Sequence, residues 1–219
     1  FNVTAKRGLS LDFDISILAS EAHLPVACAV NTPSERAEAY APLREAIAAG
    51  QQGYVVFPVR DGQDLLSVED AIRTAKALQS EALPGARMGV ISSEMSRDER
   101  GRVFDDFLQR RIDVLVCTTH IEDSPPVANA TAVVVEYADL HDLVRLHRLR
   151  AHVSAGFRPG TCGFVLSETP DPVQVGRLDQ LIAERDGFRL AELDLQFRGA
   201  AALLGARATE APAFIWADP

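Results

Sequence analysis

Cysteine is scarce in this sequence, and the few cysteines are not spaced as metal ligands. They are Cys28, Cys117 and Cys162, each within an apolar run, and no C-x-x-C pair occurs. Structural zinc sites usually need such pairs. The pattern therefore argues against a zinc site and is typical of reduced thiols that pack as small hydrophobic side chains in a cytosolic protein.

Long hydrophobic runs and an excess of positive charge are also missing. The apolar segments are short and interrupted by charge, and the N-terminus lacks the features of a signal peptide, so we expect no membrane span and a cytoplasmic location. Lysine and arginine number 22 against 31 aspartates and glutamates, a net charge of −9. Proteins that bind nucleic acid on their own usually concentrate basic charge. Any DNA contact would therefore have to come from local arginines.

The residues that are present predict one full domain with an appendage. The chain has 219 residues, 47% of them hydrophobic, and it begins at Phe1 without a methionine, which suggests a fragment or a processed chain. Strands are predicted at 26–30, 54–59, 86–91, 113–119, 131–137 and 161–167, and helices at 33–50, 68–83, 97–110 and 140–156. This alternation predicts an α/β fold, a parallel sheet with helices on both faces.

Helix starts are marked by capping residues. Thr32 before Pro33 predicts the start of the first helix, and Ser67 that of the second. Ser96 with Glu99 predicts a capping box for the third. Beyond residue 167 the alternation stops, and 172–185 and 188–197 predict a helical hairpin followed by an irregular tail.

The stretch 113–156 should carry the function, because a loop after a buried strand of a parallel sheet is where such domains place ligands. Three arginines of its helix could form a basic face that touches DNA or an ordinary solvated surface: Arg145, Arg148 and Arg150. The three histidines His141, His147 and His152 are too far apart or face differently, so no metal site is expected. Cys117 with His120 could suggest a nucleophile and its base, but strand-end packing is the safer interpretation of Cys117.

Nearly the whole chain resembles the C-terminal part of the RecG family of bacterial branched-DNA helicases. The resemblance is carried by LDFDIS, YVVFPV, RMGVISSEMSRDERGRVFDDFLQRRIDVLVCTTHIE, NATAVVVEYA, LVRLHRLRAHV, GFRLAELDLQFRGAAALLGAR and FIWADP. The transcription-repair coupling translocases share much of this pattern, and the first and last segments favour RecG. The resemblance implies a RecA-like second motor lobe of the P-loop NTPase type. It divides the chain into a lead-in from the end of the first lobe (1–24), the lobe itself (25–168) and a helical hairpin with a translocation-motif-like tail (169–219).

Such motors hydrolyse ATP between two lobes, so the resemblance also implies an N-terminal motor lobe and branched or duplex DNA as partners. The part of the ATP site that the first lobe supplies is missing from this chain, which has no G-x-x-x-x-G-K-S/T loop and no acidic D-E-x-H box. We therefore expect no cofactor in this chain; ATP and Mg²⁺ would bind only if a full-length parent is active.

The part of the ATP site that the second lobe supplies has the sequence Q-L-R-G-R-V-G-R-G in the family. The aligned residues here, 148–156, depart from it. The two arginine-finger positions are occupied by His152 and Ala155, and two glycines by Ala151 and Ser154. No catalytic residue is therefore assigned, because losing a finger costs on the order of 10³ to 10⁵ in rate.

The loop before it departs from T-T-V-I-E-V-G-V-D-V-P-N-A at Ser124 and Pro126. Two prolines, Pro125 and Pro126, delete backbone donors that could have met a phosphate. The loop retains four family residues: Thr118, Thr119, Glu122 and Asn129. Asp123 adds a negative charge that would repel a phosphate. The resemblance makes Glu122 and Arg150 the residues near the nucleotide and both threonines DNA contacts.

The appendage keeps three arginines at functional positions of the family, which the resemblance assigns to DNA: Arg177, Arg198 and Arg207. The first two could instead pair with nearby acidic residues. A glutamine of the same loop is replaced by Ala208, and P-G-E by alanines at 200–202.

Three hypotheses follow. The leading one is a catalytically degenerate RecG-like lobe that acts as a structural or DNA-engaging module in DNA repair and recombination. The second is a working ATP-dependent helicase, which would need a compensating arginine such as Arg150 or Arg158. The third is a protein-interaction scaffold that no longer binds DNA, which the acidic balance would suit.

Overall fold

The computed structural model describes residues 25–60, 63–64, 67–118, 121–153, 158–184, 189–190 and 192–193. The chain divides into a unit of residues 23–185 and a second unit of residues 1–22 with 186–219. In the second unit only 189–190 and 192–193 are described, and all four are helical. The predicted lead-in and tail, and the remainder of the second hairpin helix, lie outside the described residues.

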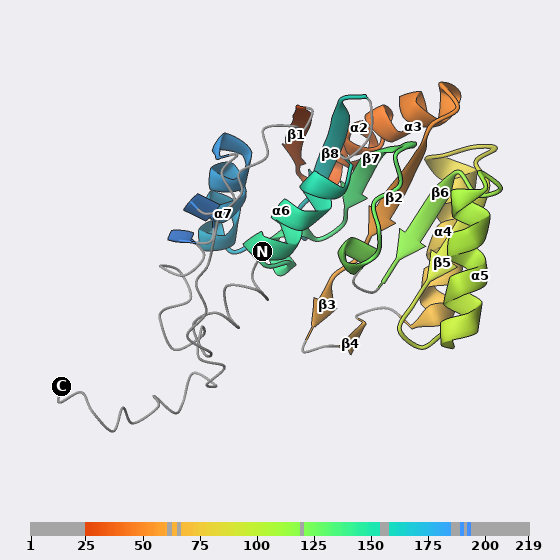
Figure 1. Ribbon diagram of the computed structural model, residues 1–219. Helices are drawn as coiled ribbons and strands as arrows, with labels where there is room; N and C mark the ends of the chain where they lie inside the picture. The colour runs from red at the N-terminus through yellow and green to blue at the C-terminus, as the bar shows by residue number, and fades with distance from the viewer. Residues whose placement is uncertain are drawn as a thin grey trace, which may run out of the picture. The chain divides into compact units, whose positions relative to one another are not determined.

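Unit 23–185 is built on one six-stranded sheet, as the alternating pattern predicted. The strands are β1(Val26–Asn31), β2(Gln52–Val56), β5(Met88–Ile91), β6(Val114–Cys117), β7(Ala130–Val135) and β8(Gly160–Val165). Their spatial order is β1-β8-β7-β2-β6-β5, and every neighbouring pair is parallel. β1 and β5 therefore form the two edges (Figure 1). The α/β prediction is confirmed.

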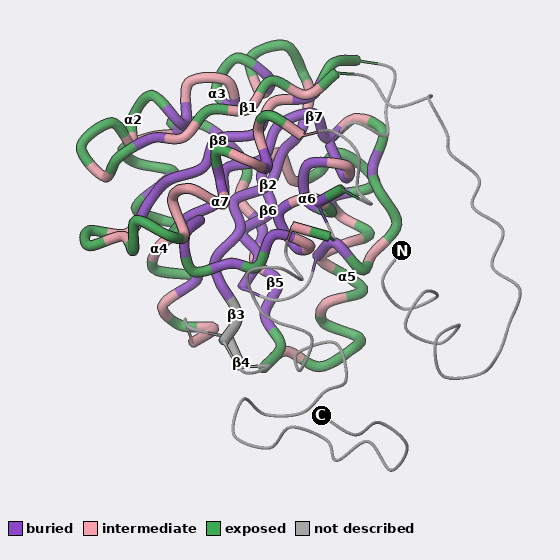
Figure 2. Tube along the Cα trace, turned by 90° about the vertical axis from the view of Figure 1, so that its left-hand side faces the viewer, coloured by how far each residue is buried: buried purple, intermediate pink, exposed green. Residues whose placement is uncertain are grey.

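Alternate residues of each strand point to opposite sides of the sheet, so both faces present side chains for packing. Helices cover both faces. On one face, Leu43 of α3(Ala41–Ala48) and Leu78 of α4(Val68–Glu81) join a hydrophobic cluster with Val55 and Val134. On the other face, Tyr54 contacts α5(Arg97–Leu108) and α6(Leu143–His152). α7(Pro172–Ala183) packs against α6 and β1. The central strands are buried along their length (Figure 2).

The first predicted helix is wrong as a single element. It is a 3-10 turn η1(Pro33–Glu35), a short α2(Arg36–Ala39) and then α3, with the break at Tyr40. Pro42 explains the break, because its ring removes an N–H and clashes with the carbonyl four residues earlier. The predicted cap is correct, since Thr32 and Glu35 form a capping box.

The other predicted caps are confirmed. Ser67 accepts from the N–H of Asp70 at the start of α4, and Ser96 with Glu99 forms the capping box of α5. Element ends differ by a few residues. α5 ends at 108 rather than 110, because Arg110 adopts a positive φ of 57° that leaves the helix. α6 spans 143–152 rather than 140–156, since Asp142 is its N-cap and η3(Ala138–Leu140) precedes it.

The segment after β2 was expected to be a strand to residue 59 and then a loop. β2 instead ends at Val56, and β3(Val59–Arg60) pairs antiparallel with β4(Gln63–Asp64). None of the helices that the structure describes is both long enough and apolar enough to cross a bilayer.

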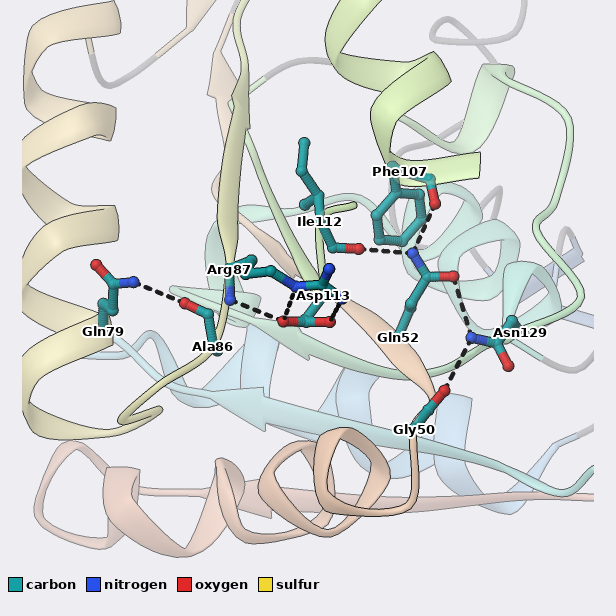
Figure 3. Close-up of polar contacts among 9 residues, drawn as sticks. All are labelled: Gly50, Gln52, Gln79, Ala86, Arg87, Phe107, Ile112, Asp113 and Asn129. Atoms are coloured by element: carbon teal, nitrogen blue, oxygen red, sulfur yellow. Dashed lines mark hydrogen bonds and ion pairs between the residues drawn. The ribbon is translucent and has the colours of Figure 1, made fainter. Parts of the chain in front are cut away.

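A polar network holds the amino edge of the sheet, where the strands begin (Figure 3). The side-chain N–H₂ of Gln52 donates to the carbonyls of Phe107 at 2.6 Å and Ile112 at 2.7 Å. Asn129 donates to Gln52 Oε1 at 3.1 Å and to the carbonyl of Gly50 at 3.3 Å. Asn129 is one of the retained loop residues, and its contacts tie the start of β7 to β2 at the edge opposite the loop after β6.

Candidate functional site

The predicted site lies at the carboxyl edge of the sheet, where the loop after β6 meets α6. The loop begins at Thr118, whose side chain is fully buried and whose N–H donates to the carbonyl of Ile91 at 3.0 Å. It then forms the 3-10 turn η2(Ile121–Asp123), against which α6 packs. Thr119 and His120 lie outside the described residues. With its side chain buried, Thr118 presents no hydroxyl at the surface.

Glu122 and Arg145 form a buried ion pair between η2 and α6. Arg145 Nε lies 3.0 Å from Glu122 Oε1, and the side chains are only 5% and 1% exposed. Because both charges are out of water, their attraction is weakly screened, and each would be costly to leave alone. The glutamate that the sequence placed near a nucleotide is therefore engaged by the lobe's own arginine.

Arg148 makes the second link between α6 and η2. Its Nη2 donates to the carbonyl of Glu122 at 3.1 Å and pairs with the carboxylate of Asp123. Both side chains are about half exposed, at 43% and 61%. Solvent screens such a pair, so its contribution to stability is small. Its effect is to occupy an arginine that could otherwise meet a phosphate.

Arg150, the other predicted nucleotide neighbour, instead caps α7. One guanidinium nitrogen, Nη1, donates to the carbonyls of Leu181 and of Glu184, the latter at 2.9 Å. Nη2 lies 2.9 Å from Nδ1 of His147. The last carbonyls of a helix lack intrahelical partners and carry partial negative charge, so a buried guanidinium fits them well. Arg150 is 8% exposed and joins α6 to α7.

His152 stands at the first arginine-finger position and is packed into the core. It is 6% exposed, and its ring lies 5.5 Å from that of Tyr54 in an edge-on arrangement. Among the residues that the structure describes, none is a hydrogen-bond partner for its Nε2. Burial lowers the pKa of His152, a shift that the charge of Glu122 opposes only in part. The second position, Ala155, lies outside the described residues.

This burial predicts an acid-sensitive lobe. Because the folded-state pKa of His152 is lowered, the unfolded chain binds more protons once the pH falls below about 6.5. Stability should therefore fall as the pH drops from about 6.5 toward the folded-state pKa. In urea titrations at pH 7.5 and 5.5, H152F should show a smaller drop in unfolding midpoint than the unchanged chain, since phenylalanine keeps the ring contact without a proton site. Equal drops would show that His152 is not the group responsible.

Four helix starts are closed by carboxylates of the chain itself. The acidic side chain that accepts a backbone N–H is Glu94 at α4, Glu99 at α5, Asp142 at α6 and Asp171 at α7. Helix N-termini bind phosphate through such N–H groups and the positive end of the helix dipole. Here these carboxylates satisfy part of the N–H set and add negative charge.

The remaining titratable candidates have structural surroundings. Burial raises the pKa of the Cys117 thiol, which disfavours the nucleophilic thiolate. His141 lies 3.1 Å from the carbonyl of Glu136, while His147 contacts Arg150. Within the described residues, His, Cys, Asp and Glu form no group of three or more that could hold a metal ion.

The predicted DNA-binding arginines fall mostly outside this cluster. Arg177 is half-buried on α7 and donates to Gln174 at 2.9 Å. Arg198 and Arg207 lie outside the described residues. Arg158, the other candidate for a compensating arginine, is exposed shortly before β8, at the edge of the sheet opposite the loop after β6.

One network at the carboxyl edge was not predicted. The carboxylate of Glu136, at the end of β7, accepts from Arg36 Nε at 2.9 Å and from the hydroxyl of Tyr40. Burial and this carboxylate together raise the pKa of Tyr40. Glu136 is almost fully buried, so it fixes the α2–α3 break against the sheet. A glutamate at the end of an apolar strand was the only sequence signal for it.

Comparison with known proteins identifies relatives of this chain. The chain is 30% identical over 194 residues to the ATP-dependent DNA helicase RecG of Synechocystis sp., covering 89% of this chain and 23% of that protein. To RecG of Mycobacterium tuberculosis it is 36% identical over 168 residues, covering 74% of this chain and 23% of the relative. A solved structure of RecG bound to a three-way DNA junction matches with a TM-score of 0.71 and 26% identity, over 84% of this chain and 24% of that one.

The chain thus spans about a quarter of the length of the relatives it matches. No protein-family model matches it. The matches confirm both the predicted resemblance and the RecA-like lobe.

Proposed function

Because this chain is a counterpart of the C-terminal region of RecG-family helicases, we propose that it is the second motor lobe of a DNA-processing protein and contributes structure rather than catalytic arginines. In this proposal the lobe keeps the RecA-like scaffold on which the family builds its motor. It no longer completes the site at which ATP would be hydrolysed.

The engagement of the α6 arginines carries the proposal. Arg145 is buried against Glu122, Arg148 is bonded to η2, and Arg150 caps α7. The finger position at His152 holds an imidazole packed on Tyr54. Arginine fingers act by placing a guanidinium at the charge that develops on the transferred phosphoryl group. Each described guanidinium of this helix already has a partner within the lobe.

The surroundings of the site support the same conclusion. Four helix starts of the lobe carry carboxylates, and Asp123 lies in η2 itself. Without a bound cation, a polyphosphate approaching this edge would meet negative charge at each of these four helix starts. The lost phosphate-contacting glycines and the two loop prolines act in the same direction.

The proposal includes DNA binding because a solved relative was determined with DNA. The matched RecG structure contains a three-way DNA junction. We place the DNA contacts of this chain on Arg177 and on the sequence-predicted Arg198 and Arg207, rather than on the buried Thr118. To contact a phosphate, the partly buried Arg177 would give up its hydrogen bond to Gln174.

DNA-stimulated ATP hydrolysis by the full-length protein that carries this region tests the catalytic half of the proposal. The expected rate is background, lower than that of an active RecG by on the order of 10³ to 10⁵. The variant H152R/A155R should stay at background too, because the loop prolines Pro125 and Pro126 and the replaced glycines at 151 and 154 remain. Hydrolysis well above background in the unchanged protein would overturn the proposal.

Fluorescence anisotropy with forked DNA at low and moderate salt tests the DNA half. Binding that weakens with salt and with R177A supports the proposal, since phosphate contacts release counterions. R158A is the matched control, because Arg158 is exposed and lies at the amino ends of the strands, opposite the loop after β6. Absence of binding even at low salt would favour a protein-interaction scaffold.

A further inference from the structure

Two of the three cysteines face each other across neighbouring strands. Cys28 on β1 and Cys162 on β8 are direct Cα partners in the parallel register. Adjacent strands are about 4.8 Å apart, within the range of about 4.4–6.8 Å between the Cα atoms of disulfides. In-register residues of a parallel pair point to the same face of the sheet. Besides burial, the neighbouring Cys28 side chain raises the pKa of Cys162.

Their surroundings differ in a way that suits stepwise oxidation. β1 is an edge strand, and Cys28 on it is partly exposed, which makes it the cysteine of the pair that a small oxidant would meet first. Cys162 is 2% exposed and would be oxidised through Cys28. Among the described strands, the edge strand pairs with β8 alone, so it can shift slightly to reach disulfide geometry. Arg150 exerts a positive potential on Cys162, which partly offsets the effect of burial on its thiolate.

We propose that Cys28 and Cys162 form a reversible disulfide when the protein meets a hydroperoxide. The thiolate of Cys28 attacks the outer oxygen of ROOH, the O–O bond breaks, and Cys28–SOH and ROH form. The sulfur of Cys162 then attacks the sulfenic sulfur, an S–S bond forms, and water leaves with the hydroxyl and one proton. The two thiols lose two electrons in total and the hydroperoxide gains them. This inference stands apart from the proposed function.

The bond would fasten the edge strand to the body of the sheet. It closes a loop of about 130 residues that contains every strand between β1 and β8. Long loops gain most from a cross-link, because the unfolded chain loses the most freedom. α7 packs against β1, so oxidation also fixes the strand beneath that helix. A dithiol reductant reverses the reaction.

The test is oxidation of the folded 219-residue chain with hydrogen peroxide, followed by thiol counting, intact mass and peptide mapping. We expect the free thiols counted after unfolding to drop from three to one, a loss of two hydrogens in mass, and a cross-linked peptide pair containing Cys28 and Cys162. The melting temperature should rise by about 5–10 °C and return on reduction. C117S should behave like the unchanged chain, because Cys117 lies on β6, which is not adjacent to either strand.

The variants C28S and C162S should each lose the cross-link and the rise in melting temperature, with C162A as a second variant if a buried serine impairs folding. Peroxide treatment that leaves three thiols in the folded chain would overturn the proposal. So would Cys28 sulfinic acid without a cross-link, or a disulfide that joins two chains.

Discussion

The variant E122A should destabilise the lobe by about 3–5 kcal/mol, because it leaves the guanidinium of Arg145 buried without its counter-ion. Breaking a buried pair costs more than the pair contributes, since the remaining charge keeps its desolvation penalty. Urea unfolding of the 219-residue chain at neutral pH measures the change. An exposed pair on the same two elements provides the matched control, and D123A should cost less than about 1 kcal/mol.

The double variant E122L/R145M separates the loss of charge pairing from a loss of packing. Replacing both members with apolar side chains of similar size removes the unpaired charge, so stability should return to near that of the unchanged chain. A double variant as unstable as E122A would show that shape, not charge, is what the two residues supply. A cost below about 1 kcal/mol for E122A would mean that water reaches the pair.

This pair also bears on catalysis. If Glu122 serves a nucleotide in a longer protein, the ion pair with Arg145 must open first, at the expense of stability. A working helicase would therefore have to recover that energy from nucleotide binding. A catalytically degenerate lobe needs no such step.

The sheet and the helix starts were predictable because their signals are local. Apolar runs of β-branched residues predicted the central strands, and a capping residue such as Ser96 satisfies N–H groups only a few positions away. The helix predicted at 33–50 is broken near Pro42, which is also a local signal, and the loop expected after residue 59 contains the β3–β4 pair. The resemblance to RecG indicated a RecA-like lobe, and the order of the strands in the sheet was not predicted, because periodicity does not fix it.

The partners of the site residues could not be predicted, because they depend on how separate elements meet. Nothing near Arg150 in sequence indicates that it would cap a helix that ends more than thirty residues later. The burial of His152 follows from the face that α6 turns toward Tyr54. The pairing of Cys28 with Cys162 depends on the register of an edge strand with the last strand of the sheet.

Replacing Arg150 decides between its two candidate roles. As the cap of α7 it is buried and holds two carbonyls, so R150A should destabilise the lobe by about 2–4 kcal/mol, because both carbonyls lose their donor. Hydrogen exchange should rise in the last turn of α7, near Leu181, more than in α4 or α5. R148A is the matched control from the same helix, and its half-exposed side chain should cost less than about 1 kcal/mol. A compensating arginine that swings toward a nucleotide would give the opposite pattern: R150A would leave the stability and the exchange of α7 unchanged and would abolish DNA-stimulated ATP hydrolysis in the full-length protein.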